Sequence, residues 1–222
     1  MNSTYSETKN AAYPKILVLG ATGPTGRHIV TRAIERGYDV TALVRSPEKA
    51  ADLQGVKLVV GDARDERALS EALDGRDAVI SALGTPASPF KEVTFLSTAT
   101  RALVGAMKAE RVSRLIAITG VGAGDSAGHG GFLFDTLIFP LLLRKVYADK
   151  NRQEAIIRES GLDWTIVRPS VLNNKPGLGA VRALTDLGAF HGGSIARQDV
   201  AQFVLDQIAS DTWLRQSPLI TR

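Results

Sequence analysis

The pattern with the clearest chemical meaning is a glycine-rich segment near the N-terminus, made of Gly20, Ala21, Thr22, Gly23, Pro24, Thr25 and Gly26. It follows an apolar run at 16–19 and precedes a helical pattern, the strand–turn–helix order of dinucleotide sites. The N–H groups and partial positive charge of a helix N-terminus attract phosphate, and glycines let the backbone approach it closely. We therefore predict a pyrophosphate site, with a ligand-free βα turn as the alternative.

A basic residue follows the second predicted strand, at 40–44. In NAD-binding Rossmann domains an Asp or Glu at this place binds the ribose 2′-OH, whereas here the residue is Arg45. A guanidinium pairs well with a 2′-phosphate through charge-assisted bonds, and Ser46 and Lys49 are further donors. The pattern predicts NADP(H) over NAD(H); a solvated surface charge is the alternative.

Two more turns follow predicted strands. Asp62, after the strand at 58–60, can accept a hydrogen bond from the adenine amino group or cap the next helix. After the strand at 78–81, small residues would let the backbone pass close to the second ribose of the cofactor, unless this is an ordinary βα turn. The residues of that turn are Ala82, Leu83, Gly84 and Thr85.

Three side chains are candidates for catalysis. Thr119 ends the strand at 115–119, at the mouth of the crevice, where its hydroxyl would bond a substrate carbonyl or merely end the strand. Tyr147 and Lys150 are three apart on a predicted helix and share a face. A lysine that lowers the pKa of a tyrosine suits hydride chemistry; a charged, exposed helix face is the alternative.

The sixth predicted strand, at 164–167, runs into Pro169. A proline stops the strand and leaves backbone groups up to Val171 free to face a nicotinamide amide. Plain strand termination is the alternative.

These residues are positioned by strands that alternate with helices, which predicts a parallel sheet covered on both faces. Beyond the strands already given, we expect one at 15–20 and an edge strand at 218–221. Helices are expected at 26–36, 67–73, 93–109, 132–160 with a break at Pro140, and 199–209. The predicted fold class is a single α/β, Rossmann-like, doubly wound sheet over 14–222. A small substrate-side elaboration comes from 120–145 and 170–197, and 1–13 is predicted to be a disordered tail.

The composition excludes several functions. The 222 residues contain no Cys, which excludes disulfides and zinc–thiolate sites, and the three His lack metal-ligand spacing. A net charge of +4 is too small to indicate nucleic acid. The apolar run at 132–143 is shorter than the roughly 20 residues of a membrane span, and the first 13 residues do not resemble a signal peptide. We predict a cytoplasmic monomer or homodimer without a metal, nucleic acid or membrane partner.

Together the motifs resemble the atypical short-chain dehydrogenase/reductase superfamily, in its NmrA-like, NAD(P)-binding branch that includes the flavin reductase/biliverdin-IXβ reductase type. They run in order through 15–208: KILVLGATGPTGRHIV, VTALVRSPEK, VVGDARD, DAVISALGT, RLIAITGVG, IIRESGLDWTIVRPS and ARQDVAQFVL. The resemblance implies that the first motif holds pyrophosphate, Arg45 the 2′-phosphate, and Asp62 and Ala63 the adenine. It places Leu83, Gly84 and Thr85 along the cofactor and Thr119, Lys150 and Pro169 near the nicotinamide.

The chain departs from flavin and biliverdin reductases at Gly120, Lys150 and Val171, where they carry Ser, His and His. Tyr147 and Lys150 are also one residue closer than in the Tyr-x-x-x-Lys motif of the superfamily. We predict an NADPH-dependent oxidoreductase that transfers hydride to a flavin, quinone or carbonyl compound, a small and flat molecule. A non-catalytic NADP(H) redox sensor and an epimerase- or isomerase-like enzyme are the alternatives. The run at 132–143 would be a lid over the substrate, a core helix or a dimer surface.

Overall fold

The computed structural model describes residues 14–88 and 90–222, so the tail predicted at 1–13 lies outside the described residues. The strands are β1 Lys15–Leu19, β2 Asp39–Val44, β3 Val56–Val60, β4 Ala78–Ser81, β5 Arg114–Ile118, β6 Asp163–Pro169, β7 Val171–Asn173, β8 Arg182–Leu184, β9 Ser194–Ala196 and β10 Leu219–Thr221. The α-helices are α1 Pro24–Glu35, α2 Glu66–Leu73, α3 Phe95–Ala109, α4 Arg144–Glu159 and α5 Arg197–Asp206. Short 3-10 helices are η1 Pro47–Ala50 and η2 Gly124–Ser126, and η3 Phe134–Leu143 is a π-helix.

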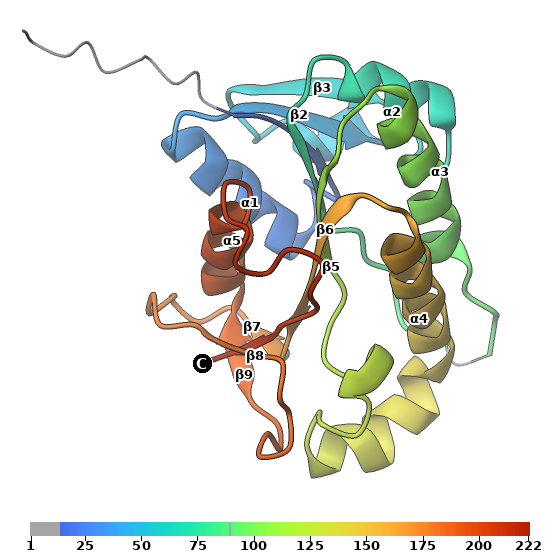
Figure 1. Ribbon diagram of the computed structural model, residues 1–222, viewed down its shortest axis with the longest axis vertical. Coiled ribbons are helices and arrows are strands. Elements are labelled where there is room, and N and C mark those ends of the chain that lie inside the picture. The colour runs from blue at the N-terminus through green and yellow to red at the C-terminus, as the bar shows by residue number, and fades with distance from the viewer. Residues whose placement is uncertain (1–13, 89) are drawn as a thin grey trace, which may run out of the picture.

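Eight strands form the central sheet in the order β3-β2-β1-β4-β5-β6-β10-β8, and all pairs are parallel except β10 with β8. Helices α1 and α5 cover one face, and α2, α3 and α4 cover the other (Figure 1). The predicted α/β Rossmann-like fold is confirmed. The first six strands and the five α-helices lie where the sequence places them, with ends that shift by a few residues.

The strands have apolar residues on both sides because both faces are buried. In β1, Leu17 and Leu19 pack into the core under α2, α3 and α4, whereas Ile16 and Val18 pack under α1 and α5. Side chains alternate across a strand, so a continuous apolar run supplies both cores.

The C-terminal strand differs from its prediction. The sequence places an edge strand at 218–221, but β10 lies inside the sheet, between β6 and β8. Leu219 pairs with Arg168 of β6 and with Leu184 of β8. The edge is β8, whose three residues come from the region where the sequence pattern is weakest.

The predicted helix break at Pro140 is also wrong. The helix continues through 132–159, and Pro140 lies inside η3. A proline breaks an α-helix because it lacks the N–H and its ring meets the carbonyl four residues earlier. The wider π-turn, with bonds to the fifth residue, accommodates that ring.

The strand order places a crevice at one edge of the sheet. From β1 the chain goes outward through β2 and β3, and it returns to the other side of β1 with β4, β5 and β6. Ligands of open α/β sheets bind at the carboxyl ends of the strands where the order reverses. Among the helices of the described residues, we find none long and apolar enough to cross a membrane.

Candidate functional site

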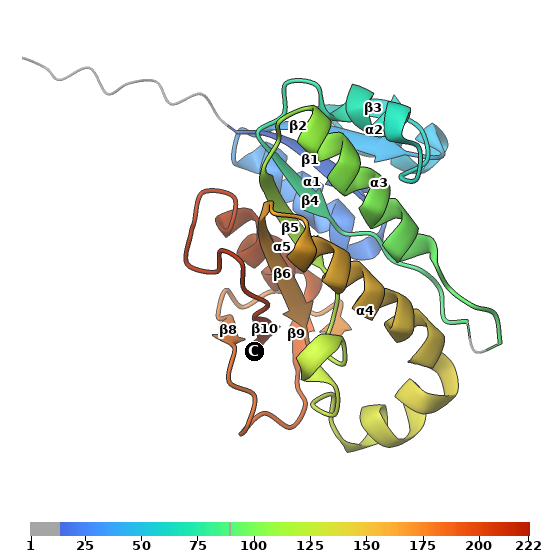
Figure 2. The ribbon, with the colours of Figure 1, turned by 45° about the vertical axis from the view of Figure 1, so that its right-hand side comes forward.

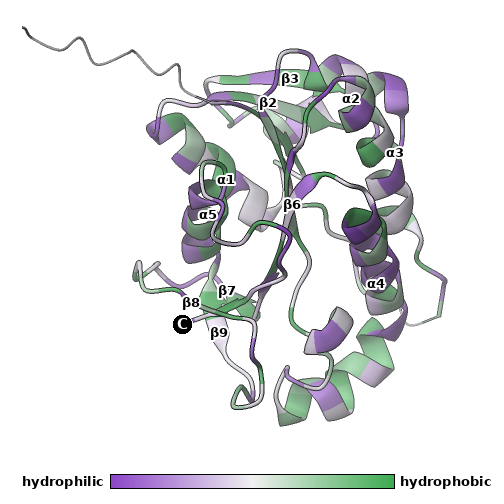
Figure 3. Ribbon diagram, viewed as in Figure 1, coloured by the Kyte–Doolittle hydropathy of each residue, from purple (hydrophilic) through white to green (hydrophobic). Residues whose placement is uncertain are grey.

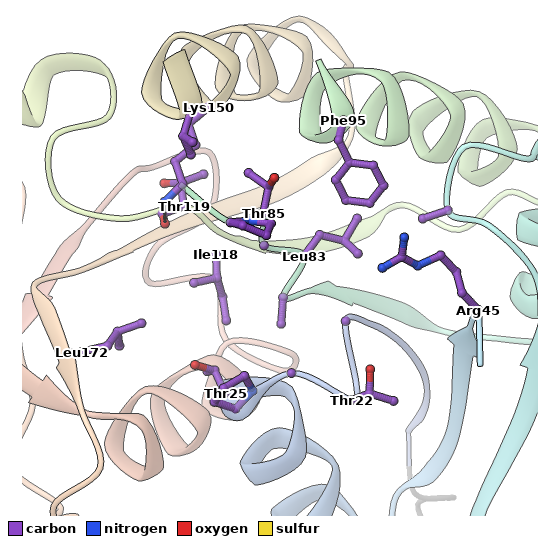
Figure 4. Close-up of a pocket in the computed structure, with 18 of the residues that line it drawn as sticks. Thr22, Thr25, Arg45, Leu83, Thr85, Phe95, Ile118, Thr119, Lys150 and Leu172 are labelled. Carbon is purple, nitrogen blue, oxygen red and sulfur yellow. Dashed lines mark hydrogen bonds between the residues drawn. The ribbon is translucent and has the colours of Figure 1, made fainter. Parts of the chain in front are cut away.

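A cavity of about 610 Å³ lies at this crevice, along the carboxyl ends of β1, β2, β4 and β5. Figure 4 shows Thr22 and Thr25 on its α1 side, Arg45 at the end of β2, and Phe95 and Lys150 reaching in from α3 and α4. The predicted residues that line it are Gly20, Thr22, Gly23, Pro24, Thr25, Arg45, Ala63, Ala82, Leu83, Gly84, Thr85, Thr119, Tyr147 and Lys150. Thus most of the predicted set, from six separate turns or helices, meets in one space.

The glycine turn is built for close approach. Gly20 has a φ of +79°, and a Cβ there would lie 2.4 Å from the Ala82 carbonyl oxygen. The Gly23 N–H donates to the Gly20 carbonyl at 3.0 Å, and Pro24 begins α1. No side chain caps this helix at Gly23, so the first N–H groups of α1 are left for an anion.

Gly26 has a different role from the one that the resemblance implies. It is absent from the lining residues of the cavity. A Cβ at Gly26 would lie 2.0 Å from the Gly20 carbonyl oxygen, so this glycine lets α1 pack against the turn. The third glycine of dinucleotide motifs serves such helix–strand packing.

Arg45 lines the cavity as predicted, and its guanidinium carbon lies 5.9 Å from the centre of the Phe95 ring. The exposed guanidinium is held over an aromatic face, where cation–π attraction limits its motion. Ser46, by contrast, does not line the cavity but precedes the short helix η1 as its N-cap residue.

Asp62 is engaged elsewhere. Its carboxylate accepts hydrogen bonds from the backbone N–H and the guanidinium of Arg64, at 2.8–2.9 Å. The Arg64 side chain lowers the pKa of Asp62 to about 2. Asp62 does not line the cavity, and the cap of α2 is Asp65, which accepts from the Arg67 N–H. The capping role predicted for Asp62 is therefore wrong, and its adenine role stays a prediction.

Sequence reasoning missed several lining residues. Gly61 had a signal, because it follows β3 directly; a Cβ there would lie 2.5 Å from that of Ala68. Arg197, the first residue of α5, adds a second arginine to the wall and had no signal in the sequence. The missed residues are Leu43, Val44, Gly61, Pro86, Phe95, Ile118, Leu143, Val146, Leu172 and Arg197.

A buried polar network holds the catalytic candidates. The Thr119 hydroxyl donates to Glu154 Oε1 at 2.8 Å, and Lys150 Nζ donates to the Thr119 carbonyl at 2.6 Å. The Arg168 guanidinium donates to both oxygens of Glu154, at 3.0 and 2.7 Å, and also to Asp125. Because the Thr119 hydroxyl already donates its hydrogen bond to Glu154, it is not free to donate to a substrate carbonyl, as the sequence suggested.

Tyr147 is also unlike the prediction. Burial, with a smaller contribution from Asp135, raises the pKa of Tyr147 to about 12 instead of lowering it. Lys150 Nζ lies 4.7 Å from the centre of the tyrosine ring, over its face. The ring packs against Phe134 and Phe139, with centroids 6.1 and 5.0 Å away. Tyr147 is therefore a weak acid in an aromatic wall.

Lys150 gives a first prediction, about stability and pH. Burial lowers its pKa to about 8, although Glu154 opposes the shift. The folded protein thus releases the Lys150 proton at lower pH than the unfolded chain, whose lysine pKa is about 10.4. Between these values the unfolded state binds more protons, so Lys150 becomes less destabilising as the pH rises.

We expect the free energy of unfolding of the wild type, relative to Lys150→Met, to increase from about pH 8 to about pH 10. Urea titrations of both proteins across this range measure it. The ionisation of Tyr147 is common to both proteins and cancels in the difference. A difference that is flat or falls with pH would contradict the placement of Lys150.

A second cavity of about 670 Å³ adjoins the first. The two share Thr119, Tyr147, Lys150 and Leu172. Its other lining residues are mostly glycines of the 120–131 and 191–193 loops and apolar side chains such as Phe132, Phe134 and Ile138, with Ser170 and His191 as the polar ones. Pro169 and Val171, predicted as cofactor ligands, line this second cavity and not the first.

The first cavity fits a dinucleotide. It has an uncapped helix N-terminus, glycines at positions where a Cβ would collide, and two arginines, Arg45 and Arg197. Between Arg45 and Lys150, residues at the ends of several strands line the cavity (Figure 4). The glycine turn would face the pyrophosphate, and Lys150 and Thr119 lie where the second cavity begins.

Relatives at the sequence level cover most of the chain. An uncharacterised chloroplastic protein of Arabidopsis thaliana is 32% identical, over 92% of this chain and 76% of its own length. An uncharacterised sugar epimerase of Bacillus subtilis is 31% identical, over 86% of both. The NAD(P)H azoreductase of Xenophilus azovorans is 33% identical over 69% of this chain and 47% of its own length.

Solved structures share the fold. An anaerobillin reductase of Escherichia coli O157:H7 superposes with a TM-score of 0.79 at 23% identity, over 93% of this chain and 96% of its own. A short-chain dehydrogenase/reductase of Veillonella parvula, in complex with NADP, gives 0.77 at 19% identity over 95% of both chains. A family model described as NAD(P)H-binding matches residues 20–211, which include the glycine turn, both cavities' shared wall and α5. This chain is a member of that NAD(P)H-binding family.

Proposed function

We propose that the protein is an NADPH-dependent reductase of a small, flat acceptor. The observation that carries this proposal is the pair of adjoining cavities with a common wall of Thr119, Tyr147, Lys150 and Leu172. One cavity has cations and a helix N-terminus, which suit a dinucleotide, and the other is mostly apolar, which suits an aromatic acceptor. Reduced NADP, when bound, supplies a hydride to such an acceptor.

The residues of the chain bind and orient. The glycine turn and α1 would hold the pyrophosphate, and Arg45 the 2′-phosphate. Lys150, fixed by the Thr119 carbonyl, is within reach of both cavities and would orient a ribose hydroxyl or an acceptor oxygen. The rings of Tyr147, Phe134 and Phe139 pack against one another, and Tyr147 and Phe134 give the second cavity an aromatic side.

Proton supply supports a flavin, quinone or azo-type acceptor over an aliphatic ketone. The phenol of Tyr147 has a pKa raised to about 12, and the Thr119 hydroxyl donates its hydrogen bond to Glu154. Neither of these two side chains is a good acid, and His191, another candidate donor in the second cavity, is exposed to solvent. Reduction of a quinone or flavin can take its proton from solvent. The azoreductase relative is consistent with this acceptor class.

The same weak acids favour a second candidate, a redox sensor that binds NADP(H) without turnover. Purified protein titrated with NADPH and NADH, followed by nicotinamide fluorescence, and then mixed with FMN and a quinone, separates the two. Tight NADPH binding with oxidation on addition of an acceptor supports the reductase. Tight binding of both redox forms without oxidation by any acceptor supports the sensor. If neither nucleotide binds, both proposals are wrong.

The choice of NADPH rests on Arg45 and gives a second prediction. Arg45→Asp removes a cation from the cavity wall and places a carboxylate there, which would repel the 2′-phosphate. We expect NADPH binding to weaken by about 1.5–3 kcal/mol, the range for a hydrogen bond to a charged group. NADH binding should be retained, because NADH has no 2′-phosphate.

Fluorescence titration with both nucleotides measures the change. Arg101→Asp, an exposed position on α3 outside both cavities, makes the same change of charge and serves as the control. Equal loss of NADPH affinity in both variants would indicate a general charge effect and no 2′-phosphate contact.

A further inference from the structure

The molecule carries a concentrated apolar surface at one end. Nine large apolar side chains are exposed in the described residues, and six of them gather around η3 and the loop before α3. We call these six the apolar rim: Phe90, Phe132, Leu133, Leu137, Leu141 and Leu142. Their exposed fractions run from 48% to 88%, and no residue of η3 is buried. An exposed apolar patch of this kind marks an interaction surface.

The two parts of the rim, Phe90 and η3, meet at the start of α4. Lys145 Nζ donates to the Phe90 carbonyl at 2.5 Å, which holds the loop of Phe90 against the start of α4. The helix of η3 projects from the end of the molecule in two views, and it is strongly hydrophobic (Figures 2 and 3). A projecting apolar ridge can enter the acyl chains of a lipid bilayer more readily than it can fit a flat protein surface.

The rim also forms the mouth of the second cavity. Phe134 and Ile138 of η3 line that cavity, so one face of this helix looks inward. Phe132 and Leu133 line it as well and yet are 85% and 61% exposed, so the cavity opens where the rim meets the surroundings. An apolar molecule that leaves a lipid bilayer at the rim would therefore enter the second cavity directly.

Basic residues border the rim. Arg144 and Lys145 follow η3, and Lys91 follows Phe90. None of the three forms an ion pair within the described part of the chain. Two acids lie nearby: Asp135 accepts from the Gly130 N–H, and Glu92 faces Arg152 at 3.9 Å. Asp135 has no ion-pair partner among the described residues, but three basic residues outweigh it, so the border carries a net positive charge, which favours contact with anionic lipid.

We propose that the apolar rim docks on the surface of an anionic lipid bilayer and that the second cavity takes an apolar acceptor dissolved there. The acceptor part rests on the proposed reductase function; the docking part does not. A second copy of the chain is the competing occupant, and the oligomeric state in solution distinguishes it from a bilayer. The sequence expectation of no membrane partner considered spanning segments, whereas an interfacial helix enters only about 5–10 Å.

Flotation of the full chain with vesicles tests the docking, using phosphatidylcholine alone and phosphatidylcholine with phosphatidylglycerol. We expect binding to the anionic vesicles. The triple variant Leu137→Ser, Leu141→Ser, Leu142→Ser should weaken it by about a hundredfold or more, because three leucines no longer enter the bilayer. These leucines line neither cavity, so NADPH binding should be unchanged. Leu178→Ser, 57% exposed and away from the rim, is the matched control and should bind like the wild type.

The border charges have their own test. Arg144→Gln should weaken binding to anionic vesicles and leave any binding to neutral vesicles unchanged. The docking proposal is wrong if the wild type binds neither kind of vesicle, or if the triple variant binds as well as the wild type. It is also wrong if sedimentation shows a dimer that the triple variant dissociates, since the rim then binds a second copy.

The two proposals fail separately. Vesicle binding without NADPH binding would refute the reductase and keep the docking surface; the reverse result would refute only the docking. If both hold, oxidation of NADPH by a long-chain quinone in anionic vesicles should fall in the triple variant. Oxidation by a water-soluble quinone should not change, because the cavities are intact.

Discussion

Glu154→Met should destabilise the protein by about 3–5 kcal/mol, the cost of leaving one partner of a buried ion pair alone. Arg168 is 1% exposed and Glu154 fully buried. Without Glu154, the guanidinium keeps only Asp125, whose side chain is 78% exposed, and the Thr119 hydroxyl loses its acceptor. We expect Lys150 and Thr119 to lose their fixed positions as a consequence. Equilibrium unfolding in urea measures the loss.

The double variant Glu154→Met, Arg168→Met should recover most of this stability, because two apolar side chains replace the buried Arg168–Glu154 pair. Arg158, which lies 3.0 Å from Glu154, is 37% exposed and can turn to solvent. Glu159→Met, at an exposed position on the same helix, should change stability by less than about 0.5 kcal/mol and is the control. A single variant as stable as the Glu159 control would show that the pair contributes nothing. A double variant less stable than the single one would contradict the charge argument.

Gly20→Ala should abolish nucleotide binding and destabilise the protein by about 2–5 kcal/mol, the sum of backbone strain and overpacking. The φ of +79° is costly for any residue with a Cβ, and that Cβ would lie 2.4 Å from the Ala82 carbonyl oxygen. The clash is with the backbone of the turn after β4, which itself lines the cavity, so relief by movement deforms the site. Urea unfolding and fluorescence titration with NADPH measure the two effects.

A glycine elsewhere separates the two costs. Gly161 has a φ of +74°, but a Cβ added there would meet nothing within 4 Å, so Gly161→Ala carries the strain without the collision. We expect it to cost about 1–2 kcal/mol and to leave NADPH binding unchanged. If Gly20→Ala were no worse than Gly161→Ala, close packing of the glycine turn against the turn after β4 would not matter for stability.

The polar network around Glu154 and the glycine turn lie on opposite sides of the first cavity. The turn shapes the part of the first cavity near α1, and the network sets the wall that both cavities share. One link reaches farther: the Gly124 N–H of the 120–131 loop donates to Asn151, and Asp125 accepts from Arg168. The glycine-rich loop, which borders the second cavity, is therefore tied to the wall through Arg168 and α4.

The fold class and most of the first cavity can be predicted from local patterns along the chain. Apolar runs, glycines and helix patterns are local signals, and six strands and five helices follow from them. Because parallel strands end at one edge, residues that follow them, such as Gly20, Arg45, Ala63, Ala82 and Thr119, had to meet there. Their convergence needs no knowledge of side-chain packing.

The contacts of those residues depend on how the helices pack on the sheet. Thr119 and Glu154 are 35 positions apart, and only the packing of α4 on β5 and β6 brings them together with Arg168. The same packing buries Tyr147, so its pKa rises where the sequence motif suggested a fall. Phe95 and Arg197 enter the cavity from helix starts whose direction no local pattern encodes.

The last strand and the π-helix show the same division. The strand at 219–221 is readable as a strand, but its place between β6 and β8 depends on long-range pairing. Pro140 lies within a π-helix, because the wide turn offers the ring a place that an α-helix does not. Periodicity predicts an element from its own residues, whereas neighbours, charge partners and exposure depend on segments distant in the chain.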